Sequence, residues 1–309
     1  PGMDIFLQQI INGLTLGSVY AVVALGYTMV YGIIQLINFA HGEVVMIGAM
    51  VAFSVITTLA GTALPPLVIV FAGILAAVPV CMLVGYAMER IAYRPLRGAP
   101  RLAPLITAIG ISIILQHVAL LVWSRNPLAF PQIIPLASFE VGGAIITGVQ
   151  IAIILSSVLM MGGLTLLVYR TKLGIAMRAT SQNPQIAGLM GIDIDRIIAF
   201  TFIVGAALGA VAGVMVGTYY GIAHYSMGSL LGLKAFSAAV LGGIGNLAGA
   251  MLGGILLGIV EALAAGYIGD LTNNVFGSNY QDVFAFLVLI AVLVFRPSGL
   301  LGERVGDRA

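Results

Sequence analysis

The chain has very little charge. Asp, Glu, Lys and Arg together make up 8% of its 309 residues, whereas a soluble domain carries about 25%. Hydrophobic residues make up 61%, and the mean hydropathy is +1.13. A soluble protein of this length cannot cover so much apolar surface with polar groups, so the shortage of charge excludes a soluble fold. The solvent around most of the chain is therefore expected to be lipid.

Other shortages exclude classes of chemistry. The single cysteine, Cys81, cannot form an internal disulfide, and it lies far from the three histidines, so no zinc spacing exists. The sequence has no Gly-Lys dipeptide for a Walker phosphate loop, no H-E-x-x-H and no G-x-S-x-G. A net charge of +2 without basic clusters among aromatics makes nucleic acid an unlikely ligand. We therefore expect a chain that is not an enzyme, holds no metal or cofactor, and moves a solute or scaffolds a protein that does.

What the sequence does contain is a series of apolar runs, each close to the roughly 20 residues that cross a bilayer as a helix. They predict an all-α polytopic membrane protein with about eight or nine transmembrane helices, some of them broken or re-entrant, in one domain over 1–309. A run at 281–296 is shorter, and one at 229–247 is interrupted by Lys234 and glycines. The expected full crossings are 5–31, 43–60, 67–88, 102–123, 148–169, 197–219 and 248–268.

The basic residues indicate the orientation. Eleven of the thirteen Lys and Arg residues fall in three segments, which the positive-inside rule places in the cytoplasm. Counting back from the first segment puts the N-terminus outside, and the third segment makes the C-terminus cytoplasmic. These residues are Arg90, Arg94, Arg97 and Arg101, then Arg170, Lys172, Arg178 and Arg196, then Arg296, Arg304 and Arg308.

Two stretches resemble each other. YGIIQLINFAHGEVVMIGAM in the first half matches YGIAHYSMGSLLGLKAFSAAVLGG in the second, and each lies between two apolar runs. Inverted repeats of this kind are common in transporters, where paired interrupted segments mark the substrate route. The sequence thus predicts repeat halves at 5–123 and 197–296, although chance similarity of Gly/Ala-rich stretches is an equal alternative.

Glycines recur at intervals of four residues on two expected helices. Such spacing draws a smooth stripe along one face, against which a second helix packs closely. We expect helix packing, with pore lining as the alternative. The glycines are Gly205, Gly209, Gly213 and Gly217 on one helix, and Gly249 and Gly253 on another.

The expected cytoplasmic segment 170–196 is far longer than a helix connection needs. It contains a helix-like piece at 175–182, then Asn183 and Pro184 as a helix start, and Gly191 as a helix end. A short helix on the cytoplasmic face suits docking to a soluble motor subunit. The alternative is an ordinary amphipathic helix at the interface.

Polar side chains within the apolar runs form the third candidate. Charge at the bilayer centre is costly, so such residues face protein or water and often mark a pathway. A different interpretation is that His41 and Glu43 lie in the first turn of a helix near the cytoplasmic interface, with Asn38 as its N-cap. We expect the cap, with a gate contact as the alternative. The translocation-path or gate candidates are Asn38, His41, Glu43, Lys234 and Glu261.

Several long blocks resemble one known family, in the right order and over nearly the whole chain. They include NGLTLGSVYAVVALGYTMVYGIIQLINFAHGEVVMIG, ERIAYRPLRGAPRLAPLITAIGISIILQ, LMGIDIDRIIAFTFIVGAALGAVAGV and LKAFSAAVLGGIGNLAGAMLGGILLGIVEAL. The family is that of the LivH-type permease subunits of bacterial branched-chain amino acid ABC importers. The resemblance implies a multi-pass protein of the inner membrane that translocates leucine, isoleucine and valine.

The resemblance also implies partners: a homologous second permease subunit of the LivM type, two ATPase subunits that hold ATP and Mg²⁺, and a periplasmic amino-acid-binding protein. The cytoplasmic segment would insert into an ATPase cleft. Alternatives are a permease for urea or short-chain amides, an ion-coupled secondary transporter, and a passive channel. The implied coupling residues are Arg178, Ala179, Asn183, Pro184, Ala187, Gly188, Gly191 and Asp193.

Overall fold

The fold is known from a computed structural model, which describes residues 2–134 and 137–302. Over these residues the chain is mostly helical, as the sequence predicts, with short strands and irregular connections between the helices. The elements in chain order are α1 (Gly2–Ile34), α2 (His41–Leu59), α3 (Pro66–Ala87), the π-helical turn η1 (Met88–Tyr93), α4 (Leu102–Val122), β1 (Leu128–Ala129), β2 (Ser138–Val141), β3 (Ala144–Thr147), α5 (Gly148–Arg170), α6 (Lys172–Gln182), α7 (Pro184–Leu189), α8 (Ile194–Tyr220), β4 (Ile222–Ala223), α9 (Met227–Gly242), α10 (Leu247–Leu271), η2 (Ser278–Tyr280) and α11 (Gln281–Phe295).

Seven helices within the described residues are long and apolar enough to cross a membrane, and each coincides with one of the seven predicted full crossings. The two doubtful runs form shorter helices. α9 has 16 residues and α11 has 15, which gives each of them about 24 Å or less, short of the roughly 30 Å hydrocarbon core. α9 also ends at Gly242, so it does not fill the whole run at 229–247.

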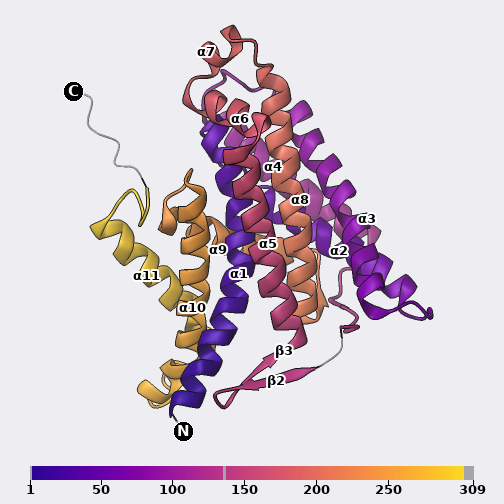
Figure 1. The fold of residues 1–309 in the computed structure, drawn as a ribbon, viewed down its shortest axis with the longest axis vertical. Helices are drawn as coiled ribbons and strands as arrows, with labels where there is room; N and C mark the ends of the chain where they lie inside the picture. Colours follow the sequence, from indigo (N-terminus) through magenta and orange to yellow (C-terminus); the bar gives the residue numbers. More distant parts are fainter. Residues whose placement is uncertain (1, 135–136, 303–309) are drawn as a thin grey trace.

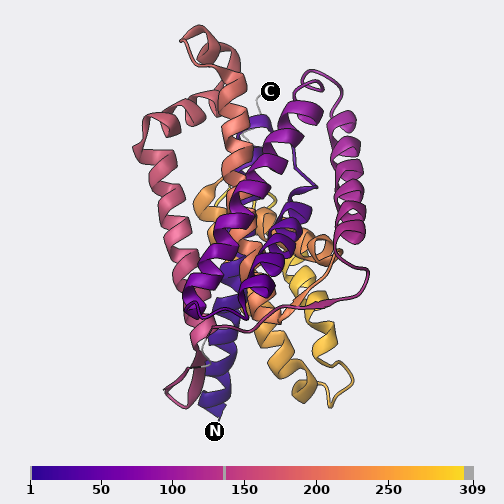
Figure 2. The same ribbon diagram turned by 90° about the vertical axis from the view of Figure 1, so that its right-hand side faces the viewer.

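The long helix α1 forms the centre of the bundle. It packs against α10, α8, α9 and α5, and its residues from Gly13 to Val30 are buried with the exception of Leu14. Figure 1 shows α1 running almost the full height of the molecule beside α5 and α10. Figure 2 shows α4 and α5 at opposite margins.

The two ends of the bundle differ. In Figure 1, α6 and α7 extend beyond one end, while the N-terminus and the β2–β3 hairpin lie at the other. Arg97 pairs with Asp195 at the start of α8, so the first and second basic segments share the α6–α7 end. The chain after Arg296 returns to the end of α9, where Leu300 and Leu301 donate backbone hydrogen bonds to Leu241 and Gly242. Arg304 and Arg308 lie outside the described residues.

α2 begins in the middle of the bundle, not near the interface as we expected. His41 lies against Gly26 of α1 and Gly209 of α8. Glu43 is bonded to Ser112, which is ten residues from each end of α4 (112 − 102 and 122 − 112). After α1 the chain changes direction at Gln35, whose φ is +56°. Residues 35–40 then descend into the bundle, so the interfacial placement predicted for His41 and Glu43 was wrong.

Asn38 is not the N-cap of α2. The cap position is Ala40, without a side-chain hydrogen bond. The Asn38 Oδ1 atom instead accepts hydrogen bonds from the Ala40 amide (3.1 Å) and the Tyr93 hydroxyl (3.2 Å). Asn38 therefore holds the irregular chain before α2 in place and joins it to η1.

α9 starts beside α2. A Cβ added to Gly42 would meet Gly228 and Gly232, and one added to Gly228 would meet Gly42. The two stretches that resemble each other in sequence thus bring their helix starts into backbone contact. The inverted repeat itself stays a prediction.

The regularly spaced glycines lie where two helices approach each other closely, but the space left at the Cβ position differs from one glycine to the next. A Cβ on Gly213 would collide with the backbone of Val45 and Ala49, and one on Gly253 with that of Ala238. A Cβ on Gly217 would meet the Phe130 ring 2.7 Å away, and one on Gly209 the His41 ring at 3.2 Å. Gly249 lies against Gly242, whereas Gly205 leaves 3.5 Å to Gly26.

Gly213→Ala should destabilise the protein, because the added methyl has only backbone to displace. Overpacking of this kind costs about 1–3 kcal/mol. We expect a Tm several degrees below wild type in detergent, measured by differential scanning fluorimetry. Gly163→Ala on α5 is the matched control, since nothing lies within 4 Å of its Cβ position. Equal Tm values for the two variants would contradict the packing role of Gly213.

Candidate functional site

Glu43 is the central polar group at mid-depth. Its side chain is 2% exposed. The Oε1 atom accepts hydrogen bonds from Gln116 (2.8 Å), Ser112 (3.0 Å) and Ser229 (3.4 Å), so one oxygen joins α2 to α4 and α9. The Oε2 atom is buried and has no hydrogen-bond partner among the described residues. It faces Gly228, at 3.1 Å from the position of a Cβ on that residue.

A cavity of about 280 Å³ lies at Glu43. Its polar lining comes from Tyr27, Glu43, Ser112 and Ser229, and the side chains of Phe39, Leu233 and Phe236 give it an apolar wall. Ser229 and Leu233 are exposed, so the cavity opens on the surface between α4 and α9. It is thus an apolar pocket with one carboxylate oxygen to spare.

The two other candidates near Glu43 do not line this cavity. The His41 ring is buried against Gly26 and Gly209 and contacts the Tyr27 ring edge-on, with 4.9 Å between centroids. Asn38 is used by Ala40 and Tyr93. Both side chains therefore fix the start of α2, and only Glu43 reaches the pocket. Among the described residues no group of His, Cys, Asp or Glu has the grouping of a metal site.

Lys234 and Glu261 form a second buried cluster with two residues that sequence reasoning missed. The Lys234 Nζ atom lies 3.4 Å from Glu261 Oε1 and 2.6 Å from Asp282 Oδ1. The Tyr20 hydroxyl donates to Glu261 Oε2 at 2.7 Å. One cation and two carboxylates thus join α9, α10, α11 and α1. The cluster clamps the short helices α9 and α11 to the long ones.

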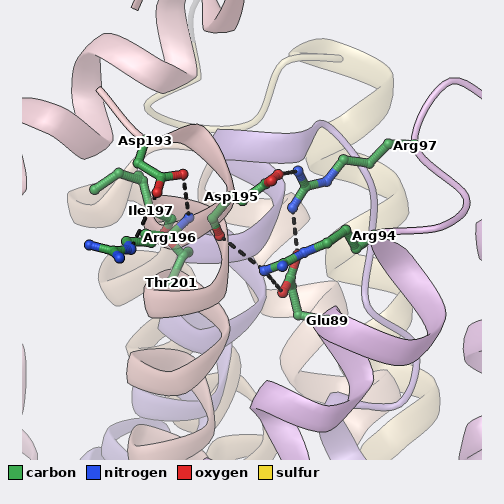
Figure 3. A network of polar contacts seen from close by, with 8 residues as sticks. All are labelled: Glu89, Arg94, Arg97, Asp193, Asp195, Arg196, Ile197 and Thr201. Carbon is green, nitrogen blue, oxygen red and sulfur yellow. Dashed lines mark hydrogen bonds and ion pairs between the residues drawn. The ribbon is translucent and has the colours of Figure 1, made fainter. Parts of the chain in front are cut away.

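A third network lies at the α6–α7 end, and Figure 3 shows its members. Glu89, on η1, is fully buried. Its carboxylate accepts from Arg94 Nη2 at 2.9 Å and Arg97 Nη2 at 2.5 Å, and Arg97 also bonds Asp195 of α8. The hydrogen bond to Glu89 raises the pKa of Arg94 above its ordinary value. The network therefore joins the end of α3 to the beginning of α8 by charges on both.

The segment between α5 and α8 has the predicted helix start and end. The Asn183 side chain caps α7 by accepting from the Ile186 amide at 3.1 Å, and Pro184 follows it. Gly191 takes a φ of +93° at the end of the turn. Asp193 caps α8 through the Arg196 amide. The chain thus turns sharply before and after α7, and α7 projects beyond the end of the bundle (Figure 1).

The coupling candidates on this segment do not share one face. Arg178 bonds the Val168 carbonyl oxygen at 3.1 Å and stacks over Tyr169, so it braces α6 against α5. Ala187 is buried, and Ala179 is half-buried, whereas Gly188 is exposed. The outer surface also carries apolar side chains that we had not singled out: Ile186, Leu189 and Met190, of which Leu189 is 86% and Met190 78% exposed.

Some missed residues had a sequence signal. Ser112 and Gln116 are four apart on an otherwise apolar helix, which puts both on one face. Glu89 directly precedes a run of arginines, at positions that allow Arg94 and Arg97 to reach back to it. Asp282 and Tyr20 carried no such signal, because their partners come from distant helices.

Glu89→Ala should destabilise the protein strongly. Removing one partner of a buried charge cluster costs about 3–5 kcal/mol, here moderated because both arginines keep some contact with water. We expect the largest loss of Tm among single charge substitutions at this end, measured in detergent. Arg196→Ala is the control, because its pair with Asp193 is exposed and such pairs contribute about 0–1 kcal/mol. A Tm for Glu89→Ala equal to that of the control would show that Glu89 does not stabilise the contact between η1 and α8.

Comparison with known proteins agrees with this architecture. Residues 9–293 match the family model described as branched-chain amino acid transport system / permease component. The chain is 49% identical over 308 residues to the high-affinity branched-chain amino acid transport system permease protein BraD of Pseudomonas aeruginosa, covering 98% of both chains. It is 45% identical over 304 residues to the high-affinity permease protein LivH of Escherichia coli K12, covering 96% of both. It is also 29% identical over 316 residues to a probable LivH of Methanocaldococcus jannaschii, covering 97% of this chain and 94% of that protein. No solved structure matches the chain.

With a family model matched over 9–293 and relatives similar along nearly their whole length, this chain belongs to the family of branched-chain amino acid transport system permease components.

Proposed function

We propose that this chain is the membrane-spanning permease subunit of an ABC importer for leucine, isoleucine and valine. The observation that carries the proposal is the near full-length similarity to permeases whose names specify branched-chain amino acid transport. The names of these relatives do not favour urea or a short-chain amide as the cargo. The apolar cavity with few polar groups suits a zwitterion that has an aliphatic side chain.

The energy for transport would come from other subunits. The sequence has no Gly-Lys dipeptide and so no Walker phosphate loop. The proposed assembly therefore contains two ATPase subunits that bind ATP and Mg²⁺, a homologous second permease, and a periplasmic binding protein that selects the amino acid. In this assembly the present chain is not an enzyme.

The basic residues support an inner-membrane location with the α6–α7 end in the cytoplasm. Arg94, Arg97 and Arg178 lie at this end, which the positive-inside rule assigns to the cytoplasmic side. Leu300 and Leu301 bond the end of α9, and the connection that follows α9 lines one cavity with Arg178 of α6. The C-terminus would then be cytoplasmic, and the β2–β3 hairpin would face the binding protein.

Docking of an ATPase is assigned to α7 and the turn after it. Ile186, Leu189 and Met190 present apolar side chains outside the bundle, where three neighbouring charges, Asp193, Asp195 and Arg196, would be a polar rim. Apolar centres with polar rims are typical of protein interfaces. The Asn183 cap begins α7 and the Asp193 cap begins α8 directly after it, so that a movement of the ATPase would be transmitted to α8.

The mechanism that follows is rocking of the two permeases. Closure of the ATPase dimer on ATP moves α7, and the Asp195–Arg97–Glu89 network carries this movement to η1 and α3. The pore opens toward the binding protein, accepts the amino acid, and returns to the inward state after hydrolysis. Movements of packed helices as rigid bodies are an established form of such transitions.

Reconstitution tests the importer against an ion-coupled transporter or a channel. We expect proteoliposomes that hold the complete assembly to accumulate labelled leucine with ATP and binding protein present. The chain alone should accumulate none, with or without a proton gradient, because it has no means of using ATP. Robust uptake by the chain alone would overturn the proposal.

Leu189→Asp should abolish ATPase docking, because a charge replaces the most exposed apolar side chain of α7. Loss of one buried hot-spot side chain costs an interface about 2 kcal/mol or more, so we expect the ATPases to be lost from purified complexes and uptake to fall at least about tenfold. Gln185→Ala on the same helix is the control, since that side chain is exposed and polar. Full recovery of the ATPases with Leu189→Asp would place docking elsewhere.

A further inference from the structure

We propose that the pocket at Glu43 is the site where this chain receives the α-ammonium group of the amino acid in transit. The acceptor is the Glu43 Oε2 atom, and the apolar wall of Phe39, Leu233 and Phe236 receives the aliphatic side chain. This inference rests on the proposed function and adds a substrate contact to it.

The two oxygens of the Glu43 carboxylate differ in their hydrogen-bond partners. Oε1 accepts from Ser112, Gln116 and Ser229 and so accounts for the structural role of Glu43 in joining three helices. Oε2 is buried and has no hydrogen-bond partner among the described residues. A buried acceptor without a partner is unfavourable, and an ammonium group is the strongest donor that an amino acid offers to it.

The second step is the electrostatic setting. Glu43 is in the first turn of α2, a helix of 19 residues. The start of α9, a helix of 16 residues, abuts it through Gly42 and Gly228. The positive ends of two helix dipoles therefore converge on one carboxylate. A carboxylate in this position can accept from an ammonium group, and the apolar wall beside it strengthens the attraction between the two groups.

The third step is the shape and position of the cavity. Its volume of about 280 Å³ is at the lower limit for small-molecule pockets, which suits a single amino acid. It lies at the middle of α4, where the two interrupted helices meet. Discontinuous helices that start at the midplane are where transporters place substrate sites.

Lys234 and Glu261 do not offer a comparable site. Glu261 bonds Tyr20 and pairs with Lys234, and Lys234 also pairs with Asp282. Both carboxylates already have the Lys234 ammonium group as a cation partner, whereas Glu43 makes no ion pair among the described residues. Glu43 is thus the carboxylate that lacks a cation, and it also lines a cavity.

Glu43→Gln is the direct test, because glutamine keeps an Oε1 acceptor for Ser112, Gln116 and Ser229 and replaces Oε2 by an amide nitrogen. In proteoliposomes with the complete importer, we expect labelled leucine carried per ATP hydrolysed to fall at least about tenfold, as the loss of a hydrogen bond to a charged group predicts. Asp270→Asn is the control, since Asp270 is an exposed carboxylate near the end of α10. Its ratio should equal that of wild type.

Two outcomes would overturn the inference. A ratio for Glu43→Gln equal to that of wild type would show that the charge is not needed. Loss of hydrolysis together with uptake, in an intact assembly, would show that Glu43 controls the movement of the helices and not the substrate. Failure of the wild-type assembly to import leucine would instead reject the proposed function, so the two failures are distinguishable.

A second pair of variants applies if Glu43→Gln does not assemble. Ser229→Lys places an ammonium group at the mouth of the pocket, where it can occupy Oε2, while Ser229→Met fills similar space without charge. We expect the lysine variant to carry several times less leucine per ATP than the methionine variant. Equal values for the two would overturn the inference.

Discussion

The structure depends on two helices that begin in the middle of the membrane. The first amides of α2 and α9 have no partners within their own helices, and lipid offers none. Both helix starts must therefore be enclosed by protein. Direct backbone contact between Gly42 and Gly228, with Gly232 beside them, meets this need. α1, α4 and α8 complete the enclosure, and for this reason α1 is the most buried long helix of the bundle.

This enclosure explains why buried charge occurs in two forms. α9 is too short to be anchored at both surfaces, and Lys234 fixes it to α10 and α11 through Glu261 and Asp282. That cluster is closed and contributes to stability. Glu43 also holds helices together, but through one oxygen only; the other has no hydrogen-bond partner among the described residues, and the residue lines a cavity. The difference between a clamp and a binding site thus lies in whether the chain itself supplies the carboxylate with a cation.

The sequence allowed the crossings, the caps of α7 and the corner at Gly191 to be predicted, because each depends on local composition or on a turn that only certain residues make. The depth predicted for Asn38, His41 and Glu43 was wrong, and the reason is physical. Counting crossings assumes that a helix starts at the interface, and the descent of residues 35–40 breaks that assumption. The arginines after Glu89 were a local signal of its ion pairs, but nothing in the sequence indicated that Arg97 also joins Asp195, more than a hundred residues after Glu89. The resemblance between the two interrupted stretches indicated that they belong together, but not that their first turns touch.

The π-helical turn η1 connects the charge network at the α6–α7 end to the pocket. At its start Glu89 holds Arg97, which bonds Asp195 on the helix that follows α7. At its end the Tyr93 hydroxyl donates to Asn38, in the chain that leads into α2. One turn of six residues therefore contacts both the beginning of α8 and the segment that positions Glu43. Packed helices can shift as rigid bodies, so in the proposed transport cycle a shift at the beginning of α8 would reach the start of α2 through these bonds. The turn that stabilises the α6–α7 end would then also set the position of the pocket.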